Sequence, residues 1–142
     1  MNTKLIDETT FDEEEWNGWY ADSAYPMEIV KQGSRYYAQP GPTSPSAIAV
    51  LTKHFSLKHG EEHLFQLRYK ATVDAWYTLY FDQRTLTSVE LKKTSEATIS
   101  VPFKLVESEG GPGSLRIQIQ PPPDSRNDAV AIDTLYLAAV SR

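Results

Sequence analysis

Side chains suited to contacting a polar ligand occur at alternate positions in two segments of the chain. The segments are "LFQLRYKATVDAWYTLYF", from Leu64 to Phe81, and "LRIQIQ", from Leu115 to Gln120. Successive side chains of a β-strand point to opposite faces of its sheet, so one parity of each segment lies away from the core. That parity supplies six candidate ligand contacts, which are Gln66, Arg68, Trp76, Tyr80, Arg116 and Gln118.

If the strands of these segments neighbour one another in one sheet, the six side chains form a single platform. An aromatic ring packs against the C–H face of a pyranose, while arginine and glutamine present donors to vicinal hydroxyl groups. Ligand sites in general combine a broad apolar contact with a few placed polar groups. The set therefore suits a carbohydrate. A solvated sheet face or a protein contact has the same composition, because aromatic residues are common in strands, and both alternatives stay open.

No catalytic group is singled out by its spacing. His59 and His63 are four positions apart in "HGEEH", but Gly60 stands where a zinc-protease motif has its glutamate. No Gly-x-Ser-x-Gly, phosphate-loop or dinucleotide-binding motif occurs. We therefore expect a protein that is not an enzyme and has no catalytic residues. A hydrolase with two carboxylates facing one cleft, roughly 5–10 Å apart, is the weakest alternative.

The elements that position these residues are predicted to be strands. Period-2 alternation recurs along the chain, whereas helical spacing is almost absent and the "DETTFDEEEW" region is expected to hold at most one helical turn. We predict an all-β antiparallel sandwich of about eight or nine strands. The expected strands are Met27–Gln32, Ser34–Ala38, Ala47–Phe55, Leu64–Ala71, Trp76–Phe81, Ala97–Val106, Leu115–Gln120, Ile132–Ala139 and a short piece near Ser88–Leu91.

Length and composition limit the remaining possibilities. The 142 residues contain no internal repeat or linker, so we predict one domain over residues 1–142. A net charge of −5 argues against a nucleic-acid partner, and the absence of cysteine excludes disulfides and thiolate ligands. Neither a signal peptide nor a membrane-spanning run is recognised, so we expect no membrane partner and the compartment is unknown.

Three stretches between Leu5 and Val140 follow one another in an order typical of one family. They are "LIDETTFDEEEWNGW", "FSLKHGEEHLFQLRYKAT" and "AVAIDTLYLAAV", with Phe11-Asp12 as a phenylalanine–acid pair and Trp19 as the following tryptophan. On these residues the chain resembles the jelly-roll carbohydrate-binding modules of the galactose-binding-like fold that are appended to xylanases and cellulases. The sequence departs from the family pattern at Thr9-Thr10 and Thr134, where a glycine-containing turn and asparagine are more usual.

The resemblance implies a jelly roll of two antiparallel sheets that binds a glycan without catalysis, with Trp19 in its core. Related modules hold a structural calcium between the start of the chain and the closing strand. Carried over by position, the implied calcium ligands are Glu8, Asp12 and Asp133. A module of the same fold that instead mediates protein–protein contacts, or has a structural role in a larger assembly, is the alternative that stays open.

Overall fold

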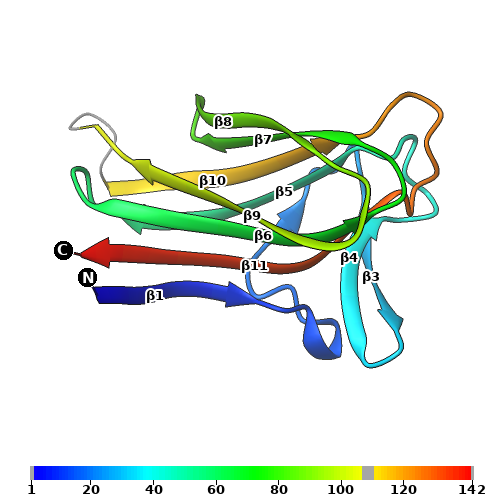
Figure 1. The fold of residues 1–142 in the computed structure, drawn as a ribbon, viewed down its shortest axis with the longest axis horizontal. Helices are drawn as coiled ribbons and strands as arrows, with labels where there is room; N and C mark the ends of the chain where they lie inside the picture. Colours follow the sequence, from blue (N-terminus) through cyan, green and yellow to red (C-terminus); the bar gives the residue numbers. More distant parts are fainter. Residues whose placement is uncertain (1, 107–110, 142) are drawn as a thin grey trace.

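The computed structural model describes residues 2–106 and 111–141, which form two antiparallel sheets packed face to face (Figure 1). Sheet A has the order β3-β4-β11-β6-β9, with β1 also paired to β11, and sheet B has the order β2-β5-β10-β7-β8. The predicted all-β antiparallel sandwich is thereby confirmed. The strands are β1 (Asn2–Thr9), β2 (Tyr20–Ala21), β3 (Met27–Gln32), β4 (Arg35–Pro40), β5 (Ala49–Leu57), β6 (Glu62–Ala71), β7 (Ala75–Phe81), β8 (Arg84–Leu91), β9 (Thr94–Lys104), β10 (Gly111–Gln120) and β11 (Val130–Ser141).

The core lies between the sheets and is built from the apolar parity of each strand. The inward side chains are at most 1% exposed, and they are Phe65, Leu67 and Tyr69 of β6, Tyr77, Leu79 and Phe81 of β7, and Leu115, Ile117 and Ile119 of β10. Burying each large apolar side chain stabilises the fold by about 2 kcal/mol. Trp19 is 2% exposed and its Nε1 donates to Asp7 Oδ2 at 3.1 Å, so its predicted core position is confirmed.

The first strand was not predicted from the sequence. A bulge between Leu5 and Asp7 shifts the register of β1 against β11, so the alternation of its side chains changes phase in mid-strand. Leu5 points outward with 52% of its surface exposed, while Asp7 is buried. The expected single turn is confirmed as the 3-10 helix η1 (Asp12–Glu14). No helix in the described part of the chain is long and apolar enough to cross a membrane.

The segment between β6 and β7 crosses from one sheet to the other. β6 pairs with β11 and β9 in sheet A, whereas β7 pairs with β10 and β8 in sheet B. A short link usually joins neighbouring antiparallel strands, but here the residues between Ala71 and Ala75 pass over the edge of the core. The outward side chains of β6 and β7 therefore lie on opposite sides of the molecule.

The β3–β4 hairpin runs steeply across the other strands of sheet A (Figure 1). It joins the sheet through the pairing of Ala38 with Ile132 on β11. Gly33 has a φ of 65° in the hairpin turn, a backbone conformation that glycine adopts without steric cost. Lys70 Nζ of β6 donates to Gln32 Oε1, which ties the end of the hairpin to the outer face of sheet A.

Candidate functional site

The outer face of sheet B carries the exposed aromatic side chains of the strands. Trp76 on β7 is 50% exposed and Tyr20 on β2 is 48% exposed. The cross-strand register aligns Tyr20, Thr52, Arg116 and Tyr80 in one row across four strands. We call this surface the sheet B face and define it by the outward residues Tyr20, Thr52, His54, Trp76, Thr78, Tyr80, Arg116 and Gln118.

A guanidinium group lies over an aromatic ring at the centre of this face. The Cζ atom of Arg116 is 4.4 Å from the centroid of the Tyr80 ring. Cation–π contacts of this kind are worth about 0.5–1 kcal/mol at exposed sites. The Nε–H of Arg116 is buried and has no hydrogen-bond partner. The side chain is therefore held by the ring rather than by an acceptor.

Hydroxyl, imidazole and amide groups surround the aromatic side chains. Tyr20 Oη lies 3.2 Å from His54 Nε2, and Ser114 Oγ lies 2.8 Å from His54 Nδ1. In the neutral imidazole one nitrogen donates and the other accepts, so the two contacts fix the ring between the hydroxyl groups. Gln118 lies opposite Thr78 in the register, and these side chains add further donors and acceptors.

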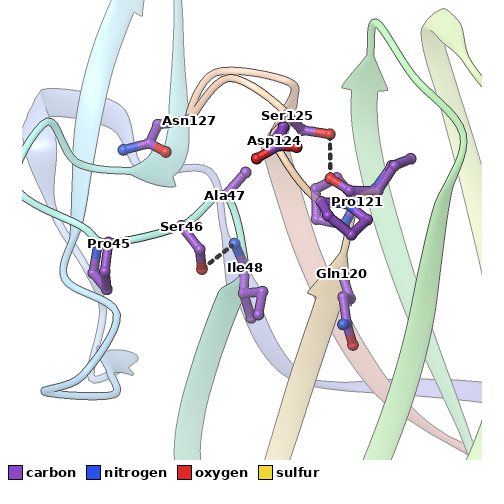
Figure 2. A pocket seen from close by; sticks show the side chains of 11 residues that line it. Pro45, Ser46, Ala47, Ile48, Gln120, Pro121, Asp124, Ser125 and Asn127 are labelled. Carbon is purple, nitrogen blue, oxygen red and sulfur yellow. Dashed lines mark hydrogen bonds between the residues drawn. The ribbon is translucent and has the colours of Figure 1, made fainter.

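Two hollows adjoin the sheet B face at the end of β10. One, of about 350 Å³, is lined by Trp76 and Glu90, and the other, of about 390 Å³, by Ile48 and Asp124; Gln120 borders both. Figure 2 shows the second hollow, where the loop after β10 turns back over the start of β5. Sequence reasoning had identified this proline-rich segment only as a loop and did not foresee either hollow.

The prediction that six residues form one platform is wrong. Trp76, Tyr80, Arg116 and Gln118 do lie together on the sheet B face, whereas Gln66 and Arg68 lie on the outer face of sheet A. The period-2 alternation correctly places all six side chains on an outer face, but it does not tell which of the two sheets each strand joins. Tyr20, Thr52 and His54 complete the face and were not predicted. The segments that contain them, "WYA" and "LTKHFS", give no signal that separates this outer face from any other.

The spacing along β7 is wider than that of two adjacent sugar rings. Trp76 and Tyr80 are four residues apart on one strand, which corresponds to roughly 13 Å at the usual strand rise. The two aromatic side chains also differ in exposure. Tyr80 is half-buried and contacts Arg116, whereas Trp76 is 50% exposed. A chain of linked sugars, rather than a pair of neighbouring rings, matches this spacing.

Gln66 and Arg68 take part in contacts within sheet A. Gln66 Nε2 donates to Ser100 Oγ at 3.1 Å. Arg68 Nη2 contacts Glu96 Oε2 at 2.7 Å, and its Nε lies 3.4 Å from Asp133 Oδ2. The donors of both predicted ligand contacts are thus used by neighbouring strands of the protein.

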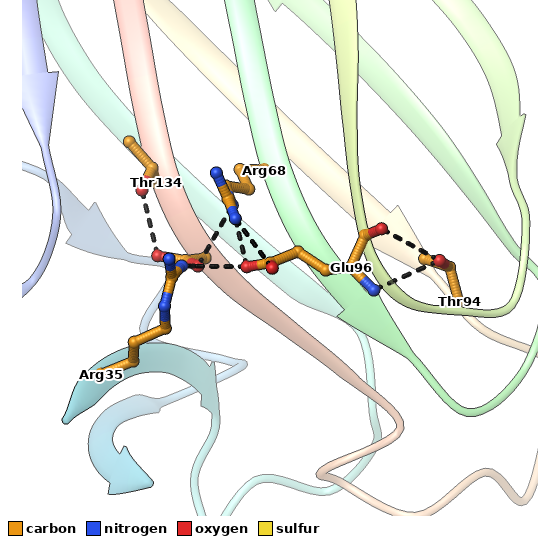
Figure 3. A network of polar contacts seen from close by, with 6 residues as sticks. Arg35, Arg68, Thr94, Glu96 and Thr134 are labelled. Carbon is orange, nitrogen blue, oxygen red and sulfur yellow. Dashed lines mark hydrogen bonds and ion pairs between the residues drawn. The ribbon is translucent and has the colours of Figure 1, made fainter. Parts of the chain in front are cut away.

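Arg35 closes this set of charges into a network (Figure 3). Its Nη1 contacts both Asp133 Oδ2 and, at 2.9 Å, Glu96 Oε1. In a flat sheet β4 and β9 would be separated by roughly 14 Å, since two strands lie between them. The contact exists because the β3–β4 hairpin folds over the outer face of sheet A. We call Arg35, Arg68, Glu96 and Asp133 the sheet A network.

The electrostatics of the sheet A network argue against acid catalysis. The hydrogen bond from Arg68 is the main cause that lowers the pKa of Glu96 to about 2, and contacts with Asp133 and the charge of Arg35 act in the same direction. A general acid needs a pKa near the working pH. Glu96 therefore lacks the raised pKa that the general acid of a hydrolase requires.

The three predicted calcium ligands occupy different surroundings. Glu8 and Asp12 are exposed and line a hollow of about 320 Å³ together with Glu15. Asp133 is 5% exposed and contacts Arg35 and Arg68, so it does not fit the predicted ligand set. Within residues 2–106 and 111–141, no three histidine or carboxylate side chains gather at a point that could hold a metal ion.

Comparison with known proteins identifies relatives by structure only. No family model and no curated protein matches the sequence. The tandem CBM22-1–CBM22-2 domain of Paenibacillus barcinonensis Xyn10C is 16% identical with a TM-score of 0.69; the match covers 96% of this chain and 50% of that one. This chain therefore spans about half the length of that tandem structure.

Two further solved structures match over almost their whole length. A cyclase from Fischerella sp. TAU is 14% identical with a TM-score of 0.69, and the match covers 98% of both chains. The carbohydrate-binding module CBM6cm-2 of Cellvibrio mixtus lichenase 5A, in complex with cellotriose, is 9% identical with a TM-score of 0.63, covering 97% of this chain and 99% of that one. The chain thus has the jelly-roll fold of carbohydrate-binding modules, which confirms the predicted resemblance at the level of fold.

Proposed function

We propose that this protein is a non-catalytic module that binds a carbohydrate chain on the sheet B face. The observation that carries the proposal is the Trp76 indole, which is 50% exposed on the same face as Gln118 and the Arg116–Tyr80 stack. An exposed indole on a sheet offers a flat apolar surface with few competing contacts, and pyranose rings present a complementary C–H face.

The polar groups of the face supply the directional part of binding. The Gln118 amide and the hydroxyl groups of Thr52 and Thr78 lie within one or two register positions of the aromatic side chains. Sugar hydroxyl groups both donate and accept, so amides and hydroxyls match them in either role. Glycan binding by the structural neighbour CBM6cm-2, which was solved with cellotriose, supports the same ligand class.

The outer face of sheet A is the less suitable surface. Its arginines and carboxylates already satisfy one another, so a sugar would have to replace strong charge-assisted contacts with neutral ones. The lowered pKa of Glu96 makes this carboxyl group unsuited to act as the proton donor of a hydrolysis. We therefore propose binding rather than catalysis, although one structural neighbour is a cyclase.

We also propose a structural calcium ion at the start of the chain, held by two of the three predicted ligands. Glu8 and Asp12 would hold it, since both carboxylates line the same hollow, and Asp133 would not. Calcium prefers several oxygen ligands, of which carboxylates are the strongest. The ion would support the β1–η1 connection and would lie apart from the sheet B face.

A glycan array, followed by titration calorimetry of the hits, tests the proposal. We expect a chemically coherent set of hits for the wild type, and Trp76→Ala should weaken binding by about tenfold or more while the protein stays folded. Leu5→Ala is the matched control, since Leu5 is 52% exposed on the other sheet, and should bind normally. Denaturant unfolding with and without a chelator tests the calcium ion, and the chelator should lower the stability of the wild type but not that of Glu8→Gln.

Two results would overturn the proposal. Normal binding by Trp76→Ala would remove the sheet B face as the site. A blank array from folded wild-type protein would favour the protein-interaction module instead, and a search for a partner by cross-linking would follow.

A further inference from the structure

The charge of Arg116 bears on which glycans the sheet B face can bind, and this inference rests on the proposed function. Arg35, Arg68 and Arg126 each contact a carboxylate. Within residues 2–106 and 111–141, the side chain of Arg116 has neither a hydrogen bond nor an ion pair, and its cation contacts only the Tyr80 ring. The positive charge of this half-buried side chain is therefore not neutralised by the protein.

The carboxylates nearest to the ends of β7 are already engaged. Glu90, which lies opposite Trp76 on β8, contacts Lys92 Nζ at 2.5 Å. Asp82, directly after β7, accepts a hydrogen bond from the backbone N–H of Ser114 at 2.8 Å. Neither carboxylate reaches the guanidinium group, so the centre of the face carries one unpaired positive charge.

We propose that the sheet B face prefers a glycan that carries an anionic group, a uronic-acid carboxylate or a sulfate ester, and that this group binds Arg116. The two Nη groups form a planar fork that matches a carboxylate, and charge-assisted hydrogen bonds are about twice as strong as neutral ones. The buried Nε–H is not accessible, so the anion meets the Nη groups.

The geometry also separates the anionic group from the stacked sugar. Arg116 lies opposite Tyr80, four residues along β7 from Trp76, and this corresponds to roughly 13 Å. The sugar that packs on Trp76 and the sugar that bears the anion are therefore different units of one chain. The ligand is an oligosaccharide, because a single acidic sugar would reach only one of the two contacts.

Calorimetry with paired probes tests this inference. The probes are xylotriose, xylotriose carrying a glucuronic acid substituent, and a sulfated xylotriose. We expect the wild type to bind an anionic probe roughly tenfold more tightly than xylotriose, and the preference to weaken as salt is raised. Arg116→Gln should abolish the preference, so that it binds the three probes with similar affinity, while Arg116→Lys should keep part of the preference. Lys104→Gln removes one exposed charge from sheet A and should change nothing.

The outcomes separate this inference from the proposed function. Equal affinity of the wild type for neutral and anionic probes would overturn the inference and leave the proposed function standing. An anionic preference that persists in Arg116→Gln would also overturn it, since another group would then hold the anion. No binding of any probe, together with a blank glycan array, would overturn both. A preference for the sulfated probe over the glucuronic acid probe would assign the anion as sulfate.

Discussion

The two outer faces of the sandwich differ in whether their arginine side chains are paired with carboxylates. On sheet A, Arg68 contacts Glu96 and Asp133, whereas on sheet B, Arg116 lies over Tyr80 with no carboxylate beside it. A guanidinium group whose donors are used within the protein contributes to the fold and offers little to a ligand. One without an acceptor contributes little to the fold and is ready to bind an anion. The same residue type thus has a structural role on one face and a proposed binding role on the other.

The largest effect on stability is expected from the removal of Asp133, the buried carboxylate of the sheet A network. Asp133→Ala should lower the free energy of unfolding by about 2 kcal/mol, because it leaves two neighbouring guanidinium groups without their shared carboxylate. Denaturant unfolding measures the loss, and glycan binding by the folded variant should stay normal. Asp128→Ala, which removes a carboxylate from an exposed pair with Arg126, is the control and should have little effect. A stability of Asp133→Ala equal to that of the wild type would contradict the structural role of the network.

A direct comparison of the two arginines gives the next largest effect. Arg68→Ala should lower the free energy of unfolding more than Arg116→Ala does, since it loses contacts with both Glu96 and Asp133. Arg116→Ala should lower the free energy of unfolding by about 0.5 kcal/mol, because only a cation–π contact is lost. Glycan binding should show the reverse order. Equal losses in both measurements would mean that the two faces do not differ in the way described above.

The smallest effect should appear in the pH dependence of stability. The pKa of Glu96 is lowered from its ordinary value of 4.5 to about 2, so its contribution to stability is present above pH 4.5 and is lost as the pH falls toward 2. The melting temperature of the wild type should therefore exceed that of Glu96→Gln at pH 6, and the gap should narrow through this window. A gap that stays constant down to pH 2 would show that the carboxylate charge is not its cause.

Alternation along the strands predicted the core but not the assignment of faces. The period-2 pattern of β6, β7 and β10 placed Phe65, Tyr77 and Ile117 inside, as the structure shows. The same pattern placed Gln66 and Trp76 outside, but a sandwich has two outer faces and both satisfy the pattern equally. The choice between them depends on where the chain crosses between sheets, which is decided by long-range strand pairing rather than by local sequence.

The start of the chain shows a second limit of local sequence. The bulge in β1 moves Asp7 to the inside, where its carboxylate accepts hydrogen bonds from Trp19 Nε1, Thr9 Oγ1 and Lys53 Nζ. Asn17 Nδ2 donates to the same carboxylate. In the sequence, a buried carboxylate with four donors cannot be told from a polar residue in a loop. The Asp133 carboxylate was misread for a related reason, because its partner Arg35 is 98 residues away in the sequence.

The position of β11 has a consequence for the synthesis of the protein. This strand, Val130–Ser141, pairs with β1, β4 and β6 and so holds sheet A together. On the ribosome, all strands of sheet B are complete once Gln120 has emerged, but β1 still lacks its partner strand β11. The apolar inner surface of sheet B then faces a layer that still lacks its central strand, and incompletely covered surfaces are prone to aggregate or to recruit chaperones. Folding of the nascent sandwich is therefore completed only after β11 has been synthesised.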